Sequence, residues 1–192
     1  MGQDKALLTL EPGGPPLIEI VAGRVRQVVD EVVLLGNAPA GVLPGLRRIP
    51  DSFPGSGPLG GIHAALVAAQ GGRVLVVACD MPFLNVHLLR YMTSLPDDAE
   101  AIVPVLDRPQ PLHAIYAPTC LPHIELCLRE GENRVTGWFD RVRVREIDRE
   151  TIAQFDPDLL SCFNMNTPED FERARRHLAR TQRPAGAADA VS

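Results

Sequence analysis

The chain has 192 residues, a length that suggests one domain rather than several. Apolar residues make up 45% and charged residues 22%, which is typical of a soluble globular protein. The formal net charge of −5 leaves no basic excess for binding a phosphate backbone, so we expect no nucleic-acid partner.

The apolar runs and the cysteines indicate in which cellular compartment the protein resides. The longest apolar run, residues 74–79, is far shorter than the roughly 18 residues that span a bilayer, so we expect no membrane partner and no signal peptide. No two cysteines form a CxxC pair, and each lies in an apolar run, which favours reduced core thiols and a cytoplasmic protein. These cysteines are Cys79, Cys120, Cys127 and Cys162.

The first half of the chain alternates helical and strand patterns. Apolar residues recur at helical spacing after Pro15 and Pro16, and short β-branched runs follow. The run at 73–80 is continuous and apolar, as in a strand buried on both faces. The sequence predicts helices at 17–30 and 61–70, strands at 31–36, 46–51 and 73–80, and a long loop at 51–61.

The second half continues this alternation. Thr167 is expected to cap the last helix, with Pro168 at its first position and Glu169 and Asp170 in its first turn. The sequence predicts helices at 85–95, 121–130, 133–141 and 167–179, and strands at 99–106, 111–117, 142–148 (an edge strand) and 162–166. Strand–helix alternation favours an α/β fold with a mostly parallel sheet and helices on both faces. Residues 181–192 are expected to form a disordered tail.

Candidate ligand-binding residues follow strands, because ligands in such folds bind beyond the carboxyl ends of the strands. Asp80 follows the strand at 73–80, where its carboxylate is either a magnesium ligand or a cap of the next turn. Asn164 and Asn166 alternate near a strand end, so both point the same way, as ligand-binding amides or as turn formers.

Two further candidates lie in glycine-containing stretches. In the loop 51–61, glycines allow backbone N–H groups to approach a ligand closely. Asp51 in this loop can accept hydrogen bonds from a ring N–H and an exocyclic amine, as guanine presents them. The alternative is an ordinary surface loop. Lys5 carries a compact charge that suits a phosphate, unless it is simply solvated. His113 is interpreted as a structural histidine rather than a catalytic one, and Trp138 as a core residue.

Together these stretches resemble one family, the molybdenum cofactor guanylyltransferases. The resemblance covers residues 1–180 and rests on motifs that occur in the family's order: MGQDKALL, PLIE, LLGN, PDSFPGSGPLGGIHAAL, VVACDMPFL, PLHAIY, NRVTGWF and FNMNTPEDF. It implies a Rossmann-like nucleotidyltransferase fold in a single domain. It also implies an enzyme that transfers GMP from GTP to molybdopterin-bound molybdenum, releases pyrophosphate and uses Mg²⁺.

The resemblance also implies roles for individual residues. Lys5 is expected to contact the nucleotide phosphates and Asp80 to bind Mg²⁺, which makes these two the catalytic residues. Asn37 and Asp51 are expected at the guanine nucleotide, and Asn164 and Asn166 on the pterin side. Molybdoenzymes or their chaperones are the implied protein partners.

The chain departs from the family pattern at its beginning. The family begins with a strand and a loop of the form LAGGxSxRMGxDK, of which this chain shows only Met1, Gly2, Asp4 and Lys5. We expect a longer native chain, with Met1 at an internal position of the motif, and an impaired activity without the missing loop; an inactive truncated relative is the alternative. Other readings are a CTP-dependent cytidylyltransferase on the same cofactor, an enzyme for a sugar phosphate or small metabolite, and a non-catalytic cofactor-binding module.

Overall fold

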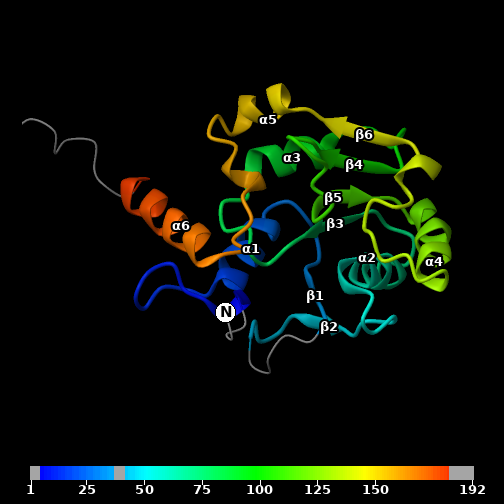
Figure 1. The fold of residues 1–192 in the computed structure, drawn as a ribbon, viewed down its shortest axis with the longest axis horizontal. Coiled ribbons are helices and arrows are strands. Elements are labelled where there is room, and N and C mark those ends of the chain that lie inside the picture. The colour runs from blue at the N-terminus through cyan, green and yellow to red at the C-terminus, as the bar shows by residue number, and fades with distance from the viewer. Residues whose placement is uncertain (1–4, 37–41, 182–192) are drawn as a thin grey trace, which may run out of the picture.

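The computed structural model describes residues 5–36 and 42–181. The helices and strands run along the chain as follows: η1 (Lys5–Leu7), α1 (Leu17–Val25), β1 (Val33–Leu35), β2 (Arg47–Ile49), α2 (Gly57–Ala68), β3 (Val74–Val77), α3 (Val86–Ser94), β4 (Ala101–Pro104), β5 (His113–Tyr116), η2 (Pro118–Cys120), α4 (Leu121–Arg129), η3 (Phe139–Arg141), β6 (Val144–Ile147), α5 (Arg149–Phe155), η4 (Leu160–Cys162) and α6 (Pro168–Thr181), where η denotes a 3₁₀ helix. Figure 1 shows their arrangement.

The strands form a mixed sheet and a separate pair. The four-stranded sheet has the order β3-β5-β4-β6, and β1 pairs with β2 in parallel. β5 is antiparallel to both of its neighbours, whereas β4 and β6 are parallel, so β3, β4 and β6 share one direction. β5 runs the other way because only residues 105–112 connect it to β4, and a parallel crossover needs a dozen or more residues. The mostly parallel α/β sheet of the sequence analysis therefore carries one reversed strand, and β6 is an edge strand as predicted.

Alternate residues of the sheet face two different helix layers. Val76, Ala114 and Val103 pack with α2 and α4 in one core cluster, which also contains Trp138. Leu75, Ile115 and Ile102 pack with α3 and α5 in the other cluster. This alternation is the two-residue period of a β-strand, and it places helices on both faces of the sheet (Figure 1). Three of the cysteines, Cys120, Cys127 and Cys162, are buried as predicted.

Side-chain caps fix the starts of three helices. Asn85 accepts hydrogen bonds from the backbone N–H groups of His87 and Leu88 at the start of α3. Thr167 and Asp170 bond to each other's backbone N–H groups at the start of α6, which is a capping box and confirms the predicted cap. α5 was not predicted, although Asp148 accepts a 2.8 Å hydrogen bond from Thr151 N in the manner of a helix cap.

Several predicted elements differ from the structure. Residues 162–166, predicted as a strand, follow η4 and pair with no strand among the described residues. The backbone N–H of Met165 instead donates a hydrogen bond to the carbonyl of Asp80, just beyond β3. The helix predicted at 133–141 reduces to turns and η3, where Glu132 accepts a hydrogen bond from Arg134 N. Thr181, assigned to the tail, is the last residue of α6, and residues 182–192 lie outside the described part.

β3 is less buried than its sequence predicts. Only Val76 of this strand is fully buried, whereas every residue of β4 and β5 is. The strand has β5 on one side and no described strand on the other. Among the residues that the structure describes, no helix is long and apolar enough to cross a membrane.

Candidate active site

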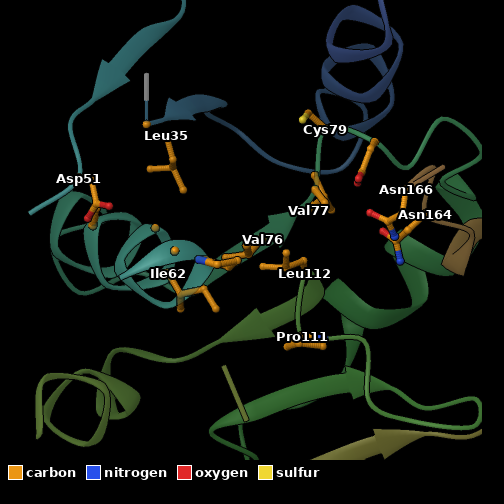
Figure 2. A pocket seen from close by; sticks show the side chains of 17 residues that line it. Leu35, Asp51, Ile62, Val76, Val77, Cys79, Pro111, Leu112, Asn164 and Asn166 are labelled. Atoms are coloured by element: carbon orange, nitrogen blue, oxygen red, sulfur yellow. The ribbon is translucent and has the colours of Figure 1, made fainter. Parts of the chain in front are cut away.

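A cavity of about 550 Å³ lies where β1 and β3 end. Leu35 and Gly36 form one wall, the residues from Val77 to Asp80 form another, and the first turns of α2 form a third. Figure 2 shows Asp51 at one end of this cavity, with Asn164 and Asn166 together at the other end. The carboxyl ends of two strands and the amino end of a helix thus meet here, which is where α/β folds bind their ligands.

Asp80 is held at the end of β3 by its neighbours. Met81 and Pro82 follow it and are buried, and its carbonyl accepts a 3.1 Å hydrogen bond from Met165 N. Burial raises the pKa of the Asp80 carboxyl above its ordinary value, and this effect outweighs a backbone hydrogen bond and the charge of Lys5, which both lower that pKa. The site therefore favours a cation beside this carboxylate, because a cation would offset the cost of its desolvation.

Lys5 reaches the same site from the other end of the chain. Its ammonium group donates a 3.3 Å hydrogen bond to the amide oxygen of Asn166. Asn166 is itself fixed, because its backbone N–H donates a 3.1 Å bond to Asp170 at the start of α6. The side chain of Asn164 donates a long 3.5 Å bond to the carbonyl of Cys162, and both asparagines line the cavity.

Asp51 packs tightly against the first turn of α2. Its Oδ1 accepts a 2.9 Å hydrogen bond from Phe53 N, which orients the carboxylate. A Cβ atom added at Gly60 would lie 2.6 Å from Oδ1 and 3.1 Å from Oδ2 of Asp51. Only glycine at position 60 therefore leaves room for the carboxylate in this place.

The amino end of α2 belongs to the cavity wall. Gly57, Pro58 and Gly61 line the cavity, and Gly57 has φ +59°, which favours glycine. Ser56 precedes the helix and its side chain makes no capping hydrogen bond. The amino end of a helix carries a partial positive charge, which suits a polar or anionic ligand. Asp51 in the preceding loop lies beside this helix end.

The structure brings together most of the predicted site residues. Asp51, Asp80, Asn164 and Asn166 line one cavity, and Lys5 joins them through Asn166. Asn37 lies outside the described residues. Asn164 and Asn166 lie together, as predicted from their spacing, although their segment forms no strand.

Sequence reasoning missed Pro111 and Leu112, which also line the cavity. They precede β5, whereas ligand-binding residues of α/β folds are expected to follow strands. Because β5 is antiparallel, its amino end lies at the edge where β3 ends, and the Leu112 carbonyl accepts a 2.9 Å bond from Ala78 N. The short connection from β4 to β5 was the available signal for this reversal.

The described residues contain no group of three His, Cys, Asp or Glu side chains that could hold a metal ion. Among these residues, Asp80 therefore belongs to no cluster of the kind that forms a closed structural metal site. A lone carboxylate fits Mg²⁺, which keeps several waters and takes its other ligands from substrate phosphates.

His113 and Trp138 lie in the core rather than in this cavity. His113 is fully buried, its burial lowers its pKa to about 4, and its Nδ1 lies 3.9 Å from the sulfur of Cys162. Trp138 is fully buried beside Tyr116. Both outcomes confirm the structural interpretation of these residues.

Comparison with known proteins gives one consistent result. Residues 1–145 match the family model of the MobA-like NTP transferase domain. The chain is 41% identical over 177 residues to a probable molybdenum cofactor guanylyltransferase of Pelotomaculum thermopropionicum, covering 91% of this chain and 85% of that protein. It is 33% identical to the molybdenum cofactor guanylyltransferase of Desulfosudis oleivorans, covering 90% of this chain and 86% of that protein.

Solved structures agree in fold. Molybdopterin-guanine dinucleotide biosynthesis protein A from Archaeoglobus fulgidus superposes with a TM-score of 0.82 at 28% identity, covering 93% of this chain and 92% of that one. The 2-C-methyl-D-erythritol 4-phosphate cytidylyltransferase of Thermus thermophilus shares the fold with a TM-score of 0.64 at 18% identity, covering 92% and 94%.

Proposed function

Because the chain belongs to the family of MobA-like NTP transferase domains, we propose that it is a molybdenum cofactor guanylyltransferase. It transfers GMP from GTP to the terminal phosphate of molybdopterin that carries molybdenum, and it releases pyrophosphate. The proposal is supported by relatives named for this activity at up to 41% identity and by the fold shared with the Archaeoglobus protein.

The observation that carries the proposal is the cavity at the ends of β1 and β3. It holds Asp51 at one end and Asp80, Asn164 and Asn166 toward the other, so one ligand can reach a base-binding carboxylate and a metal-binding carboxylate at once. A guanine presents a ring N–H and an exocyclic amine, and these two donors suit the two oxygens of a carboxylate such as Asp51. The pterin substrate then approaches from the side of Asn164 and Asn166.

Lys5 and Asp80 serve the phosphates. The ammonium of Lys5 neutralises charge on the phosphates, and its bond to Asn166 keeps it at the cavity. Asp80 would hold Mg²⁺, which supplies charge neutralisation for phosphate oxygens and for the departing pyrophosphate when it is bound.

The reaction needs little covalent chemistry from the protein. A phosphate oxygen of molybdopterin attacks the α-phosphorus of GTP in line, one P–O bond forms, and the bond to the β-phosphate oxygen breaks. The nucleophile is already an anion, so no general base is required, which agrees with the position of His113 in the core. The chain's residues thus act by positioning and by charge neutralisation.

A nucleotide competition tests the specificity. We expect the purified chain with Mg²⁺ and molybdenum-loaded molybdopterin to form the guanylyl product from GTP, and to prefer GTP when equal GTP and CTP are supplied. Asp51→Asn should reduce this preference, because an amide offers one acceptor oxygen where guanine needs two. A preference of the unmodified chain for CTP would contradict the guanylyl assignment, and cofactor binding without turnover of any nucleotide would indicate a binding module.

The product requires an acceptor, and we propose that molybdoenzymes or their chaperones receive it from this protein. Co-purification of a cofactor-free molybdoenzyme with the loaded chain, at a level above that with the unloaded chain, would support such a transfer. Equal recovery in both states would argue against it.

A further inference from the structure

The connection from β4 to β5 ends in a wall of the candidate active site that the proposed chemistry does not use. Pro111 and Leu112 line the cavity, and Figure 2 shows Leu112 between Asp51 at one end and Asn166 at the other. Neither proline nor leucine has a side-chain group that could bind a base, a metal ion or a phosphate. Any contribution of this segment to the reaction therefore comes from its position and its shape.

Leu112 belongs to the apolar face of β5, although it precedes the strand. Alternate residues of an extended segment share one face, and Leu112, Ala114 and Tyr116 all pack in or against the same core cluster. Ile62 and Val76 belong to that cluster and also line the cavity. The apolar lining of the cavity thus continues the core, with the half-buried Leu112 at its surface.

The hydroxyl group of Tyr116 holds this wall from inside the core. It donates a 2.7 Å hydrogen bond to the carbonyl of Pro111. Tyr116 is fully buried, and its ring centroid lies 5.7 Å from that of Trp138, so packing fixes the direction of the hydroxyl. Burial raises the pKa of the Tyr116 phenol above its ordinary value, so the hydroxyl keeps its proton and remains a donor at neutral pH.

Two backbone hydrogen bonds complete the attachment of the wall. The carbonyl of Leu112 accepts a 2.9 Å bond from Ala78 N, just beyond β3. His113 N donates a 3.0 Å bond to the carbonyl of Gln110. Proline has no N–H, so its carbonyl is the one backbone group through which Pro111 can be held. The tyrosine hydroxyl binds that group.

The position of the wall matches the middle of a nucleotide. The proposed function places the base at Asp51 and the phosphates near Lys5, which bonds to Asn166 at the other end of the cavity. In a nucleotide the sugar joins the base to the phosphates. Leu112 lies between the two ends, so its apolar side chain is placed to contact the sugar.

We propose that Leu112 is the wall against which the sugar of the bound nucleotide packs, and that Tyr116 is a positioning residue that holds this wall through the carbonyl of Pro111. The inference rests on the proposed function only in taking the ligand of the cavity to be a nucleoside triphosphate. It adds a specificity-determining contact and the residue that keeps it in place.

An apolar wall of this kind contributes to binding rather than to the chemical step. Bonds change only at the α-phosphorus, so the sugar contacts the wall equally in the bound nucleotide and in the transition state. Loss of the contact should therefore raise KM for GTP and leave kcat nearly unchanged. A tyrosine that only filled the core would affect stability without this effect on KM.

The first test removes the hydroxyl and keeps the ring. In Tyr116→Phe we expect KM for GTP to rise about fivefold with kcat within about twofold, and the Kd for GTP, measured by calorimetry without molybdopterin, to rise by a similar factor. Tyr91→Phe is the matched control, because Tyr91 is the only other tyrosine in the sequence and stacks on Phe155 in another core cluster. The control should leave both constants unchanged.

Amide exchange separates a local loosening of the wall from a general loss of stability. In Tyr116→Phe the amides of Ala78 and His113, whose bonds attach the wall, should exchange about fivefold faster or more. The amide of Ile152, which bonds to Asp148 at the start of α5, should change little. Equal acceleration at all three amides would show a general destabilisation and would overturn the positioning role.

The second test removes the wall itself. Leu112→Ala should raise KM for GTP about tenfold. Leu121→Ala is its control, because Leu121 packs against the same core cluster and is not one of the described residues that line the cavity. In the Leu112→Ala background, Tyr116→Phe should raise KM little further, since the tyrosine acts through the wall. Full additivity of the two changes would show that Tyr116 does not act through Leu112.

The remaining outcomes distinguish this inference from the proposed function. A Kd for GTP that is equal in the unmodified chain and in Leu112→Ala would overturn the inference and leave guanylyl transfer intact. A rise in KM for molybdopterin, with KM for GTP unchanged, would place the pterin substrate at the wall and contradict its contact with the sugar. Absence of GTP binding to the unmodified chain would contradict the proposed function, and with it the position of the sugar.

Discussion

The ammonium group of Lys5 donates a 3.3 Å hydrogen bond to the amide oxygen of Asn166, which joins residues 161 positions apart at one cavity. Lys5 also lowers the pKa of Asp80, although burial raises that pKa more. The first described residue and the segment before α6 thus meet near the end of β3.

The first prediction concerns Lys5, the only lysine in the sequence. Lys5→Met should lower kcat/KM for GTP by about 100-fold, because one charged donor to the phosphates is lost, and Lys5→Arg should restore part of the rate. The solitary lysine also allows a labelling test in which GTP protects Lys5 from an amine-reactive reagent, with the α-amino group as internal control. Equal labelling with and without saturating GTP would place Lys5 away from the nucleotide.

Replacement of Asp80 by asparagine should lower the activity but raise the stability of the fold. Asp80→Asn should nearly abolish turnover, because it removes the carboxylate that we propose as the magnesium ligand. Burial raises the pKa of Asp80 in the folded protein above its value in the unfolded chain. As the pH rises, the carboxyl of the unfolded chain therefore ionises first. The free energy of unfolding then falls until the pH exceeds the pKa of the folded state. The asparagine variant should therefore have a higher Tm than the unmodified chain at pH 7 and a similar Tm at low pH. A turnover equal to that of the unmodified chain would exclude Asp80 as the metal ligand.

Gly60 should control the position of Asp51. Gly60→Ala places a Cβ 2.6 Å from Asp51 Oδ1, so the carboxylate must move, and we expect the KM for GTP to rise by about tenfold. Gly23→Ala in α1 is the matched control, because nothing lies within 4 Å of its added Cβ. In a double-mutant cycle, Gly60→Ala should have little further effect in Asp51→Asn, and full additivity would show that the two residues act independently.

His113 should make the fold sensitive to acid. Burial lowers its pKa from 6.5 to about 4, so the unfolded chain binds a proton first as the pH falls. Stability is therefore lost between pH 6.5 and about pH 4, by up to about 3 kcal/mol. Urea unfolding at pH 7 and at pH 4.5 should show a smaller difference for His113→Gln than for the unmodified chain. The exposed His87 provides the control, since His87→Gln should leave the difference unchanged.

The sequence determined much of the candidate site. Asp80, Asp51, Asn164 and Asn166 were each predicted from the chemistry of their stretches, and all of them line one cavity. Asp51 and Asp80 do follow strands, β2 and β3, and ligands of α/β folds bind where strands end. The helix caps at Asn85 and Thr167 are local in the same sense, since each bonds within three residues.

Only the tertiary structure decided the rest. The reversal of β5, which brings Leu112 to the cavity, depends on which neighbours a strand finds and not on its own residues. The absence of a strand at 162–166 has the same cause, because a β-strand exists only where a partner is in register. The tight fit of Gly60 against the carboxylate of Asp51 is likewise a result of packing between a loop and a helix, which no local pattern contains.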